Sequence, residues 1–433
     1  MAMINKTAKA ILASLILALP LASCASADEI LDSLIFRAEA QNPMISAYHE
    51  KTVRAEEAVK EASAKMGPKA VIAAASLWQE DAVTANIPVM GGLSIPVISK
   101  NIYAAAVGFF QSIYSGGSLS ASKQAAVLAK DAASAQEKRM VQSVANSVRI
   151  SYYSLRRAQA KEKVANEALM LSENHLKKAE KLFKAGVVAK SDVLRTKVAA
   201  AEAEMNLIKT SNAVKLSLTA LERAVGAEIG EDLLKKEPKA SEDNEKIGTE
   251  EETESFAYEN REELKAYTLL AKQAEKVAKA AKGQLLPQIV AGGLLSTADG
   301  SETDTQNEWR IAAAMYWNIY DGGAVTAKTK QAKAQARELL FMLDDMKNVI
   351  KMEVTQSRLN LRSAESRKAA ALRRLAEAEE DYRIAVKRYD ANVGTNLDML
   401  DARLSLINSR TELIDTIYDI KTSKAELFFA MGK

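Results

Sequence analysis

Two carboxylates near the C-terminal end of the chain have a spacing that could do chemistry. Asp398 and Asp401 are three residues apart, so both lie on one face of a helix. Carboxylates gathered around a narrow pore select cations and raise the local field. The alternative interpretation is structural, because acids in the first turn of a helix complement the helix dipole. Both interpretations place the pair at the start of a helix.

The other reactive residue types do not assemble into a recognisable site. His49 and His175 are the only histidines, and neither has a Cys or an acid at metal-ligand spacing on its helix. The sequence contains no nucleophile elbow and no Cys–His pair. The net charge of +3 is spread over 27% charged residues of both signs, with no basic run interleaved with aromatics. We therefore predict no enzyme activity, no cofactor, no metal and no nucleic-acid partner.

The elements that carry these residues occur twice. A Tyr-x-Gly-Gly motif at residues 114–117 returns at 320–323, a spacing of 206 residues. Residues 183–187 align without a gap on 389–393, and the Gly lost there becomes Asn392. Asn is the residue that best replaces Gly in a left-handed backbone conformation. The chain is therefore an internal duplication.

The two copies differ in their acids and in length. Asp192 corresponds to Asp398, but Arg195 stands where the second copy has Asp401. The first copy therefore lacks the acid pair, and we interpret Asp192 as a helix-start residue. Upstream of residue 114 the matching positions lie 219 apart rather than 206, so the first copy is 13 residues longer there.

These patterns divide the chain into four parts. Residues 1–27 are predicted to be a secretory signal peptide, 28–225 the first structural repeat, 226–255 a polar linker and 256–433 the second repeat. Residues 25–27 form a small-residue cleavage site, whereas residues 21–24 match the lipobox of bacterial lipoproteins and end at Cys24. A lipoprotein signal would therefore end before Cys24, which would then be lipidated. Cys24 is the only Cys, so no disulfide forms within one copy.

Each repeat is predicted to contain a helix, two short strands, a very long helix, a turn and another long helix. The first helix is expected over residues 30–65. No Pro or Gly interrupts residues 118–184, which as one helix would measure about 100 Å. Apolar residues at a 3/4 spacing there predict coiled-coil packing. They include Val144, Val148, Tyr152 and Leu155.

The strands alternate in polarity. They are predicted at residues 70–78, 103–114, 287–297 and 309–320. In the last strand the odd positions are apolar and carry Trp309 and Trp317 near the two ends, while the even positions are mostly polar or small. This pattern is typical of a lipid-facing strand in a membrane barrel. Soluble sandwiches show it too, but helices of such length leave no obvious soluble partner sheet.

Pairs of glycines stand where a strand passes into a long helix. These are Gly116, Gly117, Gly322 and Gly323. Glycine supplies the unusual backbone angles of such a bend, and the flanking residues match no phosphate-binding loop.

Four strands cannot close a barrel, and open sheet edges are not tolerated in lipid. Several copies must therefore complete the barrel together. Three copies give 12 strands, an even number that leaves a lumen, and the helices would continue as a second tube.

The quoted residues resemble the TolC-type outer-membrane efflux protein family over nearly all of the mature chain. The markers are Asn42-Pro43, the duplicated Tyr-x-Gly-Gly, and the two runs at 388–394 and 397–402. The resemblance implies a mainly α fold with a membrane β-barrel, completed by a trimer whose long helices form a periplasmic barrel. It also implies an exit duct for drugs or proteins, docked through its helical tip to a periplasmic adaptor and an inner-membrane pump. The pump would be of RND, ABC or MFS type.

The resemblance also assigns roles to particular residues. Asp398 and Asp401 match aspartates at the periplasmic constriction of TolC-type channels, and Tyr389 matches a gate tyrosine. The adaptor-docking turns correspond to Lys184, Gly186, Asp192, Arg388, Asn392 and Gly394. Leu182 stands where the turn motif often has Arg, so the two turns offer an adaptor different side chains.

Two other functions are consistent with parts of the sequence. One is a secreted coiled-coil protein whose strands pack in a small soluble domain, and the other is a passive porin that works without an adaptor. The sequence does not name the cargo or the pump, because such ducts take their specificity from the pump.

Overall fold

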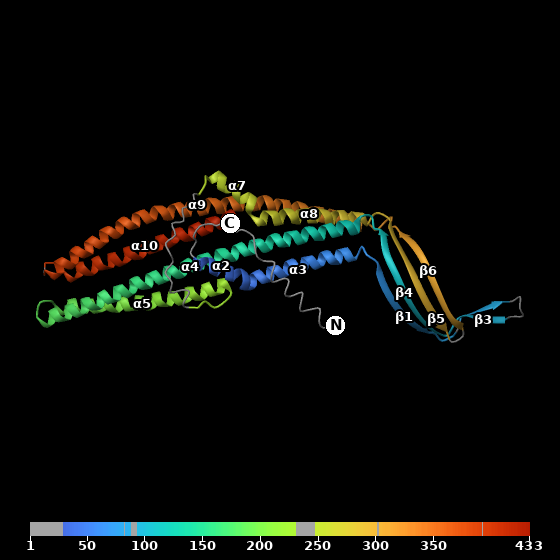
Figure 1. The fold of residues 1–433 in the computed structure, drawn as a ribbon, viewed down its shortest axis with the longest axis horizontal. Coiled ribbons are helices and arrows are strands. Elements are labelled where there is room, and N and C mark those ends of the chain that lie inside the picture. The colour runs from blue at the N-terminus through green and yellow to red at the C-terminus, as the bar shows by residue number, and fades with distance from the viewer. Residues whose placement is uncertain (1–28, 82, 88–92, 231–246, 301–302, 392) are drawn as a thin grey trace.

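The computed structural model describes residues 29–81, 83–87, 93–230, 247–300, 303–391 and 393–433. It shows an elongated molecule with a β-sheet near one end and long helices that run from the sheet to two turns at the other (Figure 1). The C-terminus lies midway along the long helices (Figure 1). The predicted signal peptide with Cys24, the middle of the predicted linker, and Asn392 lie outside the described residues.

The helices occur in matching lengths in the two copies. α4 and α9 each contain 67 residues, and α5 and α10 each contain 36. The first set is α2 (Glu29–Gln41), α3 (Pro43–Ala64), α4 (Ser118–Lys184) and α5 (Lys190–Val225). The second set is α7 (Glu250–Asn260), α8 (Glu262–Gly283), α9 (Ala324–Asp390) and α10 (Asn396–Met431). The unbroken helix expected over 118–184 is confirmed, and α7 begins inside the stretch that we assigned to a linker.

The four-stranded antiparallel sheet has the order β1-β4-β5-β6. Its strands are β1 (Lys69–Trp78), β4 (Asn101–Tyr114), β5 (Gln288–Gly300) and β6 (Thr303–Tyr316). A separate ribbon of β2 (Val83–Ile87) and β3 (Leu93–Ile98) occupies the longer connection of the first copy. The four strands predicted for the barrel are confirmed, and the longer connection of the first copy adds this separate hairpin.

The register gives the sheet two different faces. Ile72 lies opposite Val107, which lies opposite Leu295, which lies opposite Trp309. This row is apolar, and Ile72 and Trp309 are 79% and 75% exposed. The next row, whose side chains lie on the opposite face, contains only small or polar residues: Ala73, Ala106, Ser296 and Glu308. One face is thus suited to lipid and the other to water.

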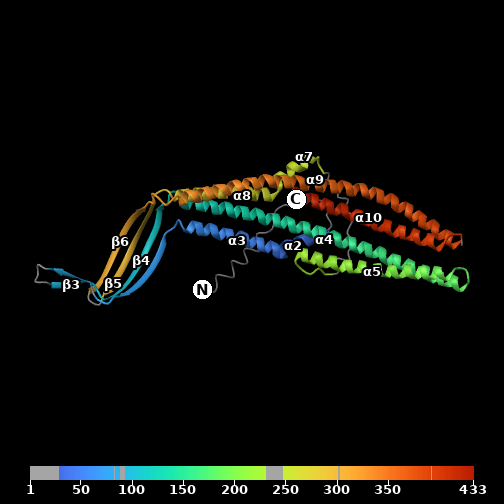
Figure 2. The same ribbon diagram turned by 180° about the vertical axis from the view of Figure 1, so that it is seen from behind.

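The helices form a single layer that continues the order of the sheet. α3 packs on α4, α4 on α8, and α8 on α9, while α5 and α10 pair with α4 and α9 toward the turns (Figures 1 and 2). The predicted 3/4 positions Val144, Val148, Tyr152 and Leu155 are buried. They form a core with residues of α2 and α5, such as Leu34 and Leu221.

The helix expected over 30–65 is broken at Asn42. The Asn42 side chain accepts a hydrogen bond from the Met44 amide at 2.8 Å, and Pro43 occupies the first helical position. Both features start a new helix rather than extend one. The Asn42 amide group also donates to the carbonyl oxygen of Ala224 at 2.7 Å. The break therefore fastens the end of α5.

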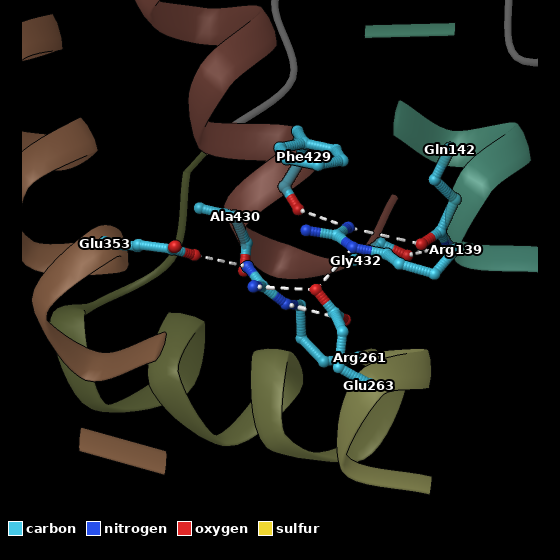
Figure 3. Close-up of polar contacts among 8 residues, drawn as sticks. All are labelled: Arg139, Gln142, Arg261, Glu263, Glu353, Phe429, Ala430 and Gly432. Atoms are coloured by element: carbon cyan, nitrogen blue, oxygen red, sulfur yellow. Dashed lines mark hydrogen bonds and ion pairs between the residues drawn. The ribbon is translucent and has the colours of Figure 1, made fainter. Parts of the chain in front are cut away.

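Arg261 occupies the corresponding place in the second copy, 219 residues after Asn42, and separates α7 from α8. Its guanidinium is 2% exposed and donates to the carbonyl oxygen of Ala430 at 3.0 Å (Figure 3). Glu263 and Glu353 form ion pairs with it at 3.0 and 2.8 Å. A buried charge is tolerated only when it is paired and hydrogen-bonded in this way. This cluster holds the C-terminal end of α10 against the break between α7 and α8.

The last predicted strand is displaced: β6 begins at Thr303, six residues before the predicted start, and ends at Tyr316, four residues before the predicted end. Residues 317–323 instead form the connection to α9. The Trp317 indole donates to the carbonyl oxygen of Leu285 at 3.0 Å, which fixes that connection against the end of α8. No described helix is long and apolar enough to cross a membrane.

The junction glycines all have positive φ, from +62° at Gly116 to +88° at Gly323. Gly117 and Gly323 precede the first residues of α4 and α9. Only the first copy is crowded: a Cβ on Gly116 would lie 2.7 Å from Leu286 Cβ and would strike the backbone of Gly283. A Cβ on Gly322 would meet nothing within 4 Å.

We predict that Gly116→Ala destabilises the protein by about 2–5 kcal/mol, because it adds a backbone clash to the strain of positive φ. Gly322→Ala, the matched control, should cost only about 1–2 kcal/mol. Thermal unfolding in detergent, followed by circular dichroism, measures both. Equal losses in the two variants would show that the close approach at Gly116 is unimportant.

Candidate functional site at the helical turns

The two turns at the far end of the molecule carry most of the sequence-predicted site residues. The first joins Lys184, the end of α4, to Lys190, the start of α5, and passes through Gly186 at φ +77°. The second joins Asp390 to Asn396. The amides of Val393 and Gly394 both donate to the carbonyl oxygen of Arg388 at 3.0 Å. Lys184 and Arg388 are exposed, so the turns present cations to solvent.

A buried polar cluster ties the two turns together. His175 Nε2 lies 2.8 Å from Asn396 Oδ1, although the two residues are 221 positions apart. The Asn396 amide group donates to the carbonyl oxygen of Asp192 at 3.2 Å and to Thr196 Oγ1 at 3.4 Å. His175, Thr196 and Asn396 are 6%, 0% and 5% exposed. Breaking a buried network of this kind leaves unpaired polar groups, so it fixes the turns relative to each other.

Tyr389 packs on this cluster through its ring. The ring lies edge-on to His175, with centroids 5.2 Å apart, and is 6% exposed. Its hydroxyl has no hydrogen-bond partner among the described residues. Burial raises the pKa of Tyr389, and the nearby carboxylates of Asp192 and Asp390 raise it further. Tyr389 therefore holds its place by packing, with an acid of the other turn close to its hydroxyl.

An ion pair closes the outer side of the cluster. Lys178 on α4 binds Asp390 at the end of α9, and its ammonium lies 5.9 Å from the centroid of the Tyr389 ring. Both partners are about half exposed, so the pair is weak and easily exchanged. The turns are thus joined by a buried neutral network and an exposed charge pair.

The acid pair is exposed and takes no part in the buried cluster. Asp398 completes a capping box: its carboxylate accepts from the Thr395 amide at 3.2 Å, and its own amide donates to Thr395 Oγ1 at 3.1 Å. These hydrogen bonds lower the pKa of Asp398. Asp401 is exposed on the same helix. Capping occupies one side of a single carboxylate, so both acids remain available to ions.

Sequence reasoning gave no role to His175, Thr196 or Asn396. Their partners lie on different helices, and no local spacing marks them. The one usable signal was that His175 interrupts an amphipathic helix at a position where an apolar residue is expected. Among the described residues, no group of three or more His, Cys, Asp or Glu could hold a metal ion.

The pH dependence of the tip follows from His175. Burial lowers its pKa, and Arg403 and Lys178 lower it further, while Asn396 and Asp390 act in the opposite direction. A lowered pKa means that the unfolded or opened state takes up the proton first. The stabilisation of the folded tip by neutral His175 is therefore complete above the ordinary histidine pKa of about 6.5 and is lost as the pH falls below it.

We therefore predict that acidification loosens the tip. Amide hydrogen exchange at the ends of α4 and α9, corrected for intrinsic rates, should accelerate severalfold between about pH 7.5 and about pH 5. His175→Gln should abolish this acceleration. His49→Gln is the control, because the pKa of His49 is raised by its hydrogen bond with Glu137, far from the tip. Unchanged acceleration in His175→Gln would disprove the assignment.

Comparisons with known proteins add to this geometry. A family model described as "Outer membrane efflux protein" matches residues 34–227 and 255–433. The chain is 24% identical over 298 residues to the probable efflux pump outer membrane protein TtgC of Pseudomonas putida, covering 68% of this chain. The match spans only 60% of the length of that relative.

Solved structures resemble the chain over nearly its full length. The outer membrane protein VceC of Vibrio cholerae superposes with a TM-score of 0.80 at 19% identity, covering 94% of this chain and 96% of VceC. The CmeC outer membrane channel of Campylobacter jejuni gives 0.79 at 16% identity, covering 96% and 90%. At these identities the likeness shows a shared fold.

Proposed function

The chain belongs to the outer membrane efflux protein family, and we propose that three copies of it form the exit duct of a tripartite pump. In this proposal the sheets join as a 12-stranded barrel in the outer membrane and the helices form a tube in the periplasm. One observation carries the proposal: the sheet and the helical layer are both open on the same two sides.

The open sides of the sheet are its edge strands. Within the described sheet β1 pairs only with β4, and β6 pairs only with β5. Unpaired backbone groups cannot remain exposed to lipid, so each edge needs a strand from another chain. The apolar face, with Trp309 and Ile311 at least 75% exposed, supports a lipid environment.

The helical layer is open in the same places. Near the sheet, α3, which leads into β1, packs on α4, and α9, which follows β6, packs on α8. α9 exposes Phe341, Met352 and Leu359, which are 73%, 60% and 60% exposed. Large exposed apolar residues mark a surface that a partner covers. A head-to-tail contact between the β1–α3 side of one copy and the β6–α9 side of the next closes into a ring.

The tip then lies on the axis at the periplasmic end. Three copies bring six carboxylates from Asp398 and Asp401 around one constriction, with Tyr389 packed behind it. The exposed turns with Lys184, Gly186, Asp192, Arg388 and Gly394 form the surface for a periplasmic adaptor. The naming of relatives as efflux pump outer membrane proteins supports a pump partner behind the adaptor. The pump type, RND, ABC or MFS, is what the family resemblance implies.

The trimer is tested by mass measurement. Chemical cross-linking in detergent, followed by mass determination, should give three chains per particle as the largest product. A folded monomer that is stable in detergent would contradict the barrel. A stable trimer that needs no detergent would instead favour the secreted coiled-coil protein.

The acid pair is tested by single-channel recording. Asp398→Asn with Asp401→Asn should lower the cation-to-anion permeability ratio severalfold, because the ring loses its charge while the cap retains an acceptor. The control is Asp344→Asn with Asp345→Asn, which changes the charge equally on exposed positions of α9 far from the tip. Unchanged selectivity in the tip variant would leave these acids as helix-start residues only.

A further inference from the structure

A basic groove lies between α8 and α9, close to the sheet. It has a volume of about 440 Å³. Lys279 and Lys282 of α8 line one side, and Lys333 and Arg337 of α9 line the other. Ala336 and Leu340 contribute an apolar floor, and Glu275 is the one acid on its wall. The groove therefore combines a cationic rim with a hydrophobic base.

The cations of the groove have no partners within the described part of the chain. None of the four makes an ion pair or hydrogen bond to another described residue, and all four are exposed. Some cations elsewhere on the long helices are paired, as Arg157 is with Asp419 at 2.6 Å, so the groove is distinguished by four cations, unpaired within the described residues, that line one pocket. Four like charges on one groove repel one another, and an anion placed among them removes that repulsion.

The position of the groove relative to the membrane follows from its distance along α8 and α9 from the end of the sheet. Lys282 is in the last turn of α8, and Trp317 donates its hydrogen bond to Leu285, three residues later. Trp at the end of an apolar strand face marks the headgroup level. Lys333 lies nine residues into α9, about 14 Å along the helix. Side chains of a helix lean toward its N-terminus, so Lys333 and Arg337 of α9, which begins at the sheet, lean toward the interface, and the upper part of the groove reaches the headgroup layer.

We propose that this groove binds the phosphate headgroup of an anionic phospholipid from the membrane leaflet next to the helices. The inference rests on the proposed function, in which the sheet spans the outer membrane. The rim cations bind the phosphate oxygens, and the first methylenes of an acyl chain cover Ala336 and Leu340. Three grooves in a trimer form a collar that fixes the height of the duct in the membrane.

The test is lipid retention by the purified protein. The full-length protein is incubated with phosphatidylglycerol or phosphatidylcholine vesicles, re-isolated in detergent, and analysed by native mass spectrometry. The wild type should retain phosphatidylglycerol in preference to phosphatidylcholine, and less of it at high salt. The triple variant Lys279→Gln, Lys333→Gln, Arg337→Gln should retain about tenfold less phosphatidylglycerol, since each cation near a membrane contributes appreciably to anionic lipid binding.

The matched control removes three exposed cations elsewhere, in Lys177→Gln, Lys209→Gln, Lys215→Gln, and should retain lipid as the wild type does. Equal retention by the groove variant and the wild type would overturn the inference. So would a groove variant with normal retention but altered ion selectivity, because the groove would then line the duct. Failure of the proposed function appears differently, as absence of conductance in the wild type whatever lipid it retains.

Discussion

The unpaired edges of the four-stranded sheet are the constraint on which the rest of the structure depends. In the proposed duct the sheet lies in lipid, where a strand must satisfy every backbone group with another strand, so β1 and β6 pair with strands of neighbouring copies. The helices next to the sheet have the same order as the strands, because α3 leads into β1 and α9 follows β6. The helical layer is therefore open on the same two sides as the sheet. In the proposed trimer, a single rule about backbone hydrogen bonds thus governs both the barrel and the helical tube.

The duplication is faithful in architecture but varied in chemistry. Asn42 and Arg261 occupy matching breaks, and each donates to a carbonyl at the end of its repeat, Ala224 and Ala430. The amide does this without a charge, whereas the guanidinium needs Glu263 and Glu353 to offset its desolvation. The C-terminal ends of α5 and α10 are therefore held in matching places by different side chains, an amide in the first copy and a guanidinium in the second.

At the tip, the residues that hold the two turns together are different from the acids that are exposed to solvent. His175, Thr196 and Asn396 are buried and join the turns, whereas Asp398 and Asp401 face solvent and leave that network undisturbed. Buried hydrogen bonds resist rearrangement because each broken one leaves an unpaired group. Protonation of His175 is predicted to weaken the contact between the turns without involving the two acids. In the proposed duct, the parts that hold the tip shut and the parts that select ions can therefore change independently.

The sequence alone determined the repeat, the length of α4 and the alternating strands, because these depend on local spacing and on the absence of helix breakers. It also contained the signal for the break at Asn42, where the Pro after an N-cap residue outweighs continuous helical periodicity. Tertiary structure alone decided the polar cluster of the tip, since His175 and Asn396 are 221 residues apart. It likewise brought the cations of α8 and α9 to one groove, because helices that pack side by side join residues that no spacing in the chain connects.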